Sequence, residues 1–108
     1  MPLLEKYSEA DEIVLGCIDR GLDRVGPKVK YLVYWHLQKI GRIKRNDILP
    51  HPEKFESGLR GLYRESAAGV ERAIIQELNA TLSMNCLLTD LVGAINAARK
   101  KAETIKLI

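Results

Sequence analysis

Residues 27–40 read PKVKYLVYWHLQKI and contain the only Trp of the chain and two of its four Tyr. At about 100° per residue, this segment predicts a helix that is apolar on nearly every side. One broad face collects Val29, Leu32, Val33, His36, Leu37 and Ile40. The aromatic residues Tyr31, Tyr34 and Trp35 fall on the other side. Such a helix needs neighbours on most sides, so we expect it to be the central and most buried helix of the fold.

The segment before it predicts a helix of its own. Ser8 and Asp11 have the spacing of a capping box, which marks a helix start. Gly26 suits a left-handed helix cap and Pro27 suits a first helical turn, so two helices should meet there as a hairpin. The apolar residues of the first helix recur at three- and four-residue spacing: Ile13, Val14, Cys17, Ile18, Leu22 and Val25.

Three further helices are predicted after Gly41, which should end the central one. A polar loop at 42–46 and a short turn at 47–49 lead to a helix that opens at Pro52. Its apolar face is Phe55, Leu59, Leu62 and Tyr63. Ser66 or a residue near Gly69 should begin the next helix, with Val70, Ile74, Leu78 and Leu82 in register. After a lapse at 83–86, the helical period resumes in a last helix through Leu88, Leu91, Val92, Ile95, Ala98, Ala102 and Ile105.

The expected fold is therefore all-α: a single domain built as a five-helix bundle. We divide it into an N-terminal tail (1–7), a four-helix core (8–82) and a C-terminal helix (83–108). A length of 108 residues fits one domain, and 46% hydrophobic with 29% charged residues is typical of globular proteins.

Composition also bounds the location of the chain. No apolar run is long enough to span a membrane. The first residues, MPLLEKYSEADE, are too acidic for a secretory signal, so we expect a cytoplasmic protein. Cys17 and Cys86 fit that location as unpaired, buried thiols.

The sequence contains no pattern that specifies catalysis, a cofactor or a metal site. His36 lies on the apolar face of its helix and is expected to be a buried core histidine, and His51 supplies no partner at metal-ligand spacing. The GLRG run at 58–61 matches a phosphate-clamping GxxG, but inside an amphipathic helix its small residues favour close helix contact. We therefore expect a protein that is not an enzyme.

Several short runs occur in an order that resembles a known family. They are Asp19-Arg20-Gly21-Leu22 followed by Gly26, Tyr34-Trp35-His36-Leu37, the run at 43–48, Pro52-Glu53-Lys54-Phe55 and Val70-Glu71. Together they resemble the NitrOD family of small all-helical archaeal output domains over residues 9–82. The resemblance implies a non-enzymatic module that is joined in some chains to signalling domains. The chain departs from the family pattern at 63–64, where an aromatic-Gly pair is replaced by Tyr63-Arg64.

The favoured function is a protein-interaction or signalling output module without catalytic residues. The surplus apolar surface of the second and last helices marks Tyr31, Trp35, Leu91 and Ile95 as candidate partner-binding residues. A two-fold homodimer through these surfaces is the expected assembly. The alternative for the last helix is that its apolar stripe folds back across the first and fourth helices.

A DNA-binding helix-turn-helix variant is the second hypothesis. A net charge of +3 permits it, with the helix opening at Pro52 as the recognition helix. Its candidate nucleic-acid-binding residues are Arg42, Lys44, Arg45, Lys54, Arg60 and Arg64. Against it, Glu53 and Glu56 would face phosphates near the start of that helix.

Overall fold

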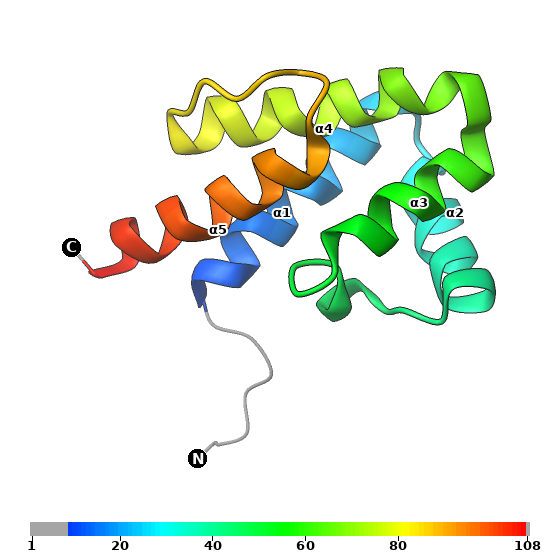
Figure 1. Ribbon diagram of the computed structural model, residues 1–108, viewed down its shortest axis with the longest axis horizontal. Helices are drawn as coiled ribbons and strands as arrows, with labels where there is room; N and C mark the ends of the chain where they lie inside the picture. Colours follow the sequence, from blue (N-terminus) through cyan, green and yellow to red (C-terminus); the bar gives the residue numbers. More distant parts are fainter. Residues whose placement is uncertain (1–8, 108) are drawn as a thin grey trace, which may run out of the picture.

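The computed structural model describes residues 9–107, in which all regular structure is helical (Figure 1). The five α-helices are α1 (Glu9–Val25), α2 (Val29–His36), α3 (Pro52–Tyr63), α4 (Ala67–Leu82) and α5 (Leu91–Leu107). A π-helical turn, η1 (Leu37–Gly41), continues α2, and two 3₁₀ turns, η2 (Arg45–Asp47) and η3 (Arg64–Ser66), flank α3. The all-α class is confirmed. The predicted tail, Ser8 of the capping box and the side chain of Ile105 lie outside the described part of the chain.

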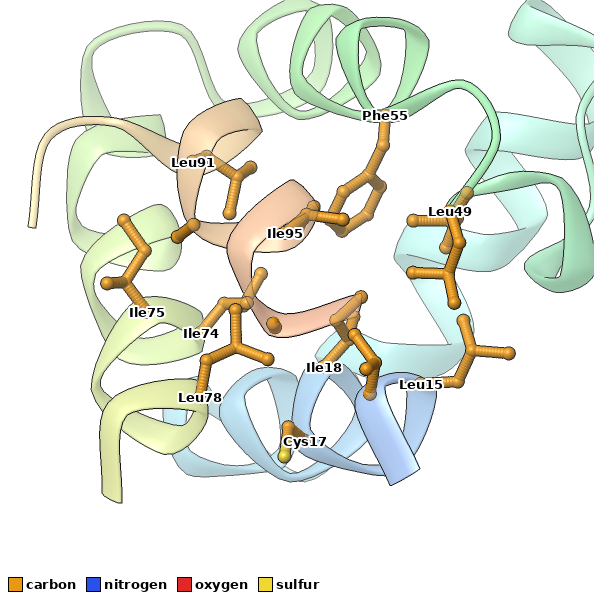
Figure 2. Packing of buried hydrophobic residues seen from close by; sticks show 14 of the residues in the cluster. Leu15, Cys17, Ile18, Leu49, Phe55, Ile74, Ile75, Leu78, Leu91 and Ile95 are labelled. Carbon is orange, nitrogen blue, oxygen red and sulfur yellow. The ribbon is translucent and has the colours of Figure 1, made fainter. Parts of the chain in front are cut away.

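The core lies where α1, α4 and α5 pack together (Figure 2). Ile18 of α1, Ile74 of α4 and Ile95 of α5 are fully buried in one apolar cluster, and Phe55 of α3 closes it from a fourth side. Burying a side chain of this size contributes roughly 1.5–3 kcal/mol relative to leaving it exposed. The predicted apolar stripes of these four helices therefore hold the fold together.

Small residues let these helices approach closely. A Cβ atom on Gly21 would lie 2.6 Å from the Cα atom of Ile74, so α1 and α4 meet at a point where only glycine fits. On α5, Ala94, Ala98 and Ala102 are buried and bring that helix down onto the others. The close packing of α1, α4 and α5 therefore occupies the centre of the core, where α2 was expected to lie.

The prediction that 27–40 forms the most buried helix is wrong. The helix α2 is short and lies at one end of the molecule (Figure 1). Only Val33 within it is buried, and Leu37 at the start of η1 is the next residue to reach the core. Leu32 and Ile40, which were expected to face inward, are 45% and 69% exposed. His36 is half-exposed rather than buried.

The loop after α2 takes the place that this helix was expected to fill. Ile43, Ile48 and Leu49 are all buried, although the segment between α2 and α3 has no helical period. These three side chains belong to the same apolar cluster as Phe55, to which α2 contributes only Val33. The segment predicted to be a polar loop and a short turn therefore contributes to the core.

The predicted left-handed cap at Gly26 is wrong. Gly26 does not adopt a left-handed conformation, and α2 begins at Val29, two residues later than expected. The helical segment ends at Gly41, as predicted, and the left-handed residue that follows it is Arg42, with φ 59° and ψ 34°. The predicted starts of α3 at Pro52 and of α4 after Ser66 agree with the structure.

Candidate interaction surface

The four predicted partner-binding residues separate into an exposed and a buried pair. Tyr31 and Trp35 on α2 are 68% and 58% exposed. Leu91 and Ile95 on α5 are fully buried, so the predicted interface on the last helix is wrong. The physical reason is that α5 folds back against α1 and α4, which cover its apolar stripe within one chain.

Exposed apolar surface is concentrated at the α2 end of the molecule. Among the described residues, every strongly exposed large apolar side chain except Leu87 belongs to the segment 25–40. Tyr31, Leu32 and Trp35 form the continuous part of this surface, which we call the α2 face. They line a shallow groove of about 820 Å³ together with Gly26, Pro27, Lys28 and Val29. Contiguous apolar surface of this kind marks interaction sites in soluble proteins.

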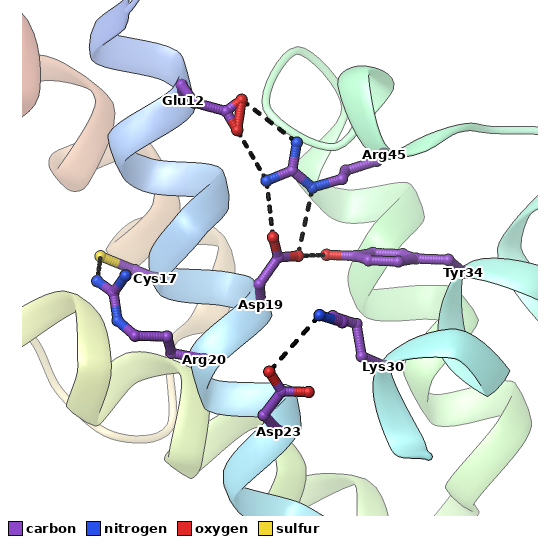
Figure 3. A network of polar contacts seen from close by, with 8 residues as sticks. All are labelled: Glu12, Cys17, Asp19, Arg20, Asp23, Lys30, Tyr34 and Arg45. Atoms are coloured by element: carbon purple, nitrogen blue, oxygen red, sulfur yellow. Dashed lines mark hydrogen bonds and ion pairs between the residues drawn. The ribbon is translucent and has the colours of Figure 1, made fainter. Parts of the chain in front are cut away.

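The opposite side of α2 is fixed to α1 by a polar network (Figure 3). The Tyr34 hydroxyl donates a hydrogen bond to the Asp19 carboxylate. Arg45 of η2 reaches the same carboxylate, with Nη2 2.7 Å from Asp19 Oδ2, and also lies 2.9 Å from Glu12 Oε1. One carboxylate of α1 therefore binds both α2 and η2, which sets the position of α2.

The network also shifts the titration of its members. Burial and the hydrogen bond to Asp19 raise the pKa of Tyr34 above its ordinary value. Burial lowers the pKa of Arg45, but its hydrogen bonds to Asp19 and Glu12 raise it by more, so the net pKa is higher. Both groups therefore keep their protons at neutral pH, as their hydrogen bonds to Asp19 require.

A second contact orients the exposed face itself. The Nζ atom of Lys30 lies 3.6 Å from Asp23 Oδ2 and 5.2 Å from the centroid of the Tyr31 ring. This cation–π contact at a partly exposed site is worth roughly 0.5–1 kcal/mol. It holds Tyr31 in place before any partner binds.

The six predicted nucleic-acid-binding residues do not form one surface. Arg45 is turned toward the α1 carboxylates, and Arg60 pairs with Glu56 and Glu71 at 3.3 and 3.4 Å. Arg60 and Arg64 line a second hollow, whereas Arg42, Lys44 and Lys54 are exposed elsewhere on the chain.

This second hollow, of about 1040 Å³, lies between the end of α3 and the start of α4. Its lining includes Arg60, Arg64 and Arg72 but also Glu65 and Glu71. Burial raises the pKa of Glu71 above its ordinary value, and Arg60 opposes that rise. The acids offset much of the positive charge, so the hollow has mixed charge and is not a uniformly basic patch.

Cys17 is buried, Cys86 is half-buried, and both are free. Within residues 9–107, no group of three or more His, Cys, Asp or Glu side chains is arranged to hold a metal ion. None of the helices in this part of the chain has the length and apolar character needed to cross a bilayer. No family model, curated protein or solved structure matches this chain. The resemblance to the NitrOD family remains a prediction.

The roles of two residues at this site, Leu32 and Arg45, were not predicted from the sequence. Leu32 belongs to the α2 face although its helical phase is that of core residues, because apolar residues in a core and at an interface have the same period. Arg45 was expected to be a solvent-exposed cation in a polar loop. Its pairing with Asp19 joins residues 26 positions apart and leaves no local signal in the sequence.

Proposed function

We propose that this chain is a non-catalytic protein-interaction module that binds a partner protein through the α2 face. The observation that carries the proposal is the exposure of Tyr31 and Trp35 on a helix whose other side is tied to α1. Tyr and Trp are enriched at interface hot spots because they bury large areas with few rotatable bonds. A helix that is already fixed loses little conformational entropy when a partner covers it.

The proposal separates residues that hold α2 from residues that bind. Val33, Tyr34 and Leu37 face the domain, so they contribute to stability. Tyr31, Leu32 and Trp35 face solvent, so truncating them leaves the domain folded. The NitrOD resemblance implies a non-enzymatic module that is joined in some chains to signalling domains, and a partner-binding role agrees with that. A cytoplasmic location remains part of this proposal.

The test begins with a photo-crosslinking amino acid placed at Leu32, which identifies the proteins that touch the α2 face in the source cells. Binding is then measured with the purified partner and the Trp35→Ala variant. Truncating an interface hot spot costs 2 kcal/mol or more, which is about a 30-fold loss of affinity. The matched control is Leu87→Ala, because Leu87 is equally exposed but lies outside the segment 25–40.

The expected result is a loss of affinity in Trp35→Ala, no loss in Leu87→Ala, and an unchanged melting temperature in both. Equal affinity of all three proteins for every crosslinked partner would refute the proposal. The DNA-binding hypothesis makes a different prediction. Replacing Arg42 and Lys44 by Gln would weaken binding to duplex DNA and flatten its salt dependence, because fewer counterions are released.

A further inference from the structure

We infer that the α2 face binds an amphipathic helix that carries carboxylates at both ends of its apolar stripe. This inference rests on the proposed function and adds the chemistry of the partner. It follows from the charges that surround the apolar groove and from the shape of the elements that form it.

The α2 face has a lysine at each end. Lys28, Tyr31, Leu32, Trp35 and Lys39 are spaced i, i+3, i+4, i+7 and i+11, which places them along one side of α2 and its continuation η1. All five side chains are exposed, and Lys28 also lines the groove. The helix α2 has eight residues and is therefore about 12 Å long at 1.5 Å per residue, and Lys28 and Lys39 lie just beyond its two ends. A partner helix of three to four turns is long enough to reach both lysines.

Lys28 is the one charged residue among the described residues that line the groove. No Asp or Glu occurs between Arg24 and Asn46 in the sequence. Among the other cations near α2, Arg24 pairs with Glu77 and Lys30 with Asp23, whereas the exposed Arg42 and Lys44 follow η1 and do not line the groove. Lys28 and Lys39 make no ion pair within residues 9–107. They are therefore available to a partner's carboxylates.

Charge also decides against a second copy of the chain as the occupant. A two-fold pairing of α2 faces would place Lys28 and Lys39 of one copy against the same lysines of the other. Like charges facing each other across an interface disfavour that pairing, whereas acidic residues complement them and accelerate association. The second surface of the predicted homodimer interface, the apolar stripe of α5, is buried within the chain.

The shape of the site favours a helical partner over an extended one. Binding of an extended peptide by strand addition requires an exposed sheet edge, and the described residues contain no strand. The groove is formed by one helix and by the turn at Gly26 and Pro27, which suits the apolar side of a second helix. The apolar residues of the partner helix would lie against Tyr31 and Trp35, and its acidic ends would lie against Lys28 and Lys39.

The experiment selects binders from a display library of 16-residue helical peptides with an apolar stripe and randomised flanking positions. Selection on the unmodified chain should enrich Asp and Glu at both flanks. Selection on the Lys28→Glu/Lys39→Glu variant should enrich Lys and Arg instead. Circular dichroism first checks that this variant has the helical content and melting temperature of the parent, and Lys28→Gln/Lys39→Gln serves as an uncharged variant in the same selection.

Affinities of the purified peptides, made without Trp, are measured through the fluorescence of Trp35, the only Trp in the chain. An acidic-flanked peptide should bind the Lys28→Glu/Lys39→Glu variant at least about tenfold more weakly at low salt, and by a smaller factor at 0.5 M salt, where charges are screened. The Leu87→Ala variant should bind like the parent.

The remaining outcomes separate this inference from the proposed function. Peptides that require Tyr31 or Leu32 but show no acidic enrichment overturn the inference and leave the interaction module in place. Peptides whose binding is insensitive to both side chains overturn both. A shift of Trp35 fluorescence with vesicles of 30% phosphatidylserine, in the absence of any peptide binding, assigns the face to an anionic membrane instead. A concentration-dependent dimer that protects Trp35 assigns it to a second copy.

Discussion

Replacing Arg64 by Gly should stabilise the protein. Arg64 joins α3 to α4 with φ 54° and ψ −117°, a conformation that is accessible to glycine and costly for any residue with a Cβ atom. Such strained backbone positions cost of order 1–3 kcal/mol. The Arg64 side chain is exposed, and no ion pair within residues 9–107 depends on it, so its removal loses little.

The expected size of the effect is the difference between two terms. Glycine relieves the strain in the folded state, but it also adds up to about 1 kcal/mol of conformational freedom to the unfolded state. A net gain of about 1 kcal/mol remains. For a domain of this size, that gain raises the melting temperature by about 4–8 °C.

The assay is urea denaturation together with a thermal melt of Arg64→Gly, Arg64→Ala and the parent. Arg64→Ala is the matched control because it removes the guanidinium and keeps the Cβ atom, so its stability should stay within about 0.5 kcal/mol of the parent. A Gly variant no more stable than the Ala variant would show that the backbone at this position is not strained.

Three further predictions test the core and the polar clusters. Gly21→Ala should destabilise the protein by about 1–3 kcal/mol, because the added Cβ atom would lie 2.6 Å from the backbone of Ile74. Gly69→Ala should stabilise it by up to about 1 kcal/mol, because the space around Gly69 is open. Chemical denaturation of both variants measures this contrast. Glu71→Gln should stabilise at neutral pH. Burial raises the folded pKa of Glu71, so the folded state binds more protons than the unfolded state between about pH 4.5 and that raised value, and stability falls as pH rises through this window. The advantage of the Gln variant should therefore vanish below about pH 4.5, and a series of melts from pH 3.5 to 8 would reveal a constant difference if this reasoning fails. Arg45→Ala should lower the free energy of unfolding by about 1–2 kcal/mol, because a charge-assisted hydrogen bond to the half-buried Asp19 carboxylate is lost. A double-mutant cycle with Tyr34→Phe should show coupling between Arg45 and Tyr34, because both side chains bind Asp19.

Helical periodicity predicted most of the elements that form the core. The stripes through Ile18, Ile74 and Leu78 belong to helices whose apolar residues are almost all buried, and each was placed on the correct face. The start at Pro52 was correct because proline acts locally on the backbone, and the start after Ser66 was also correct although the Ser66 side chain makes no capping hydrogen bond. Signals of this kind depend on neighbours within one turn, so one sequence is enough to find them.

The errors occurred where the outcome depends on contacts distant in the chain. Whether α5 lies against α1 or against another molecule depends on how closely α1 and α4 approach, and that distance is set by Gly21 against Ile74. The role of Arg45 depends on Asp19, and the burial of Ile48 and Leu49 depends on the loop path after η1. None of these pairings leaves a local period in the sequence.

The misassignment of α2 and its proposed function have the same origin. Periodicity measures apolar surface that must be covered, but it does not distinguish coverage by the same chain from coverage by another. On α2 the structure makes that distinction by direction: Val33 and Tyr34 attach the helix to the domain, whereas Tyr31 and Trp35 project away from it. Tyr31 and Trp35 do not hold the domain together, but the exposure of their apolar surface to water is unfavourable in free energy. Such surface therefore promotes association. An excess of apolar residues over what the core can bury is therefore the feature of this sequence that favours a binding function. The size of that excess becomes visible only once Val33 is seen to be the one fully buried residue of α2.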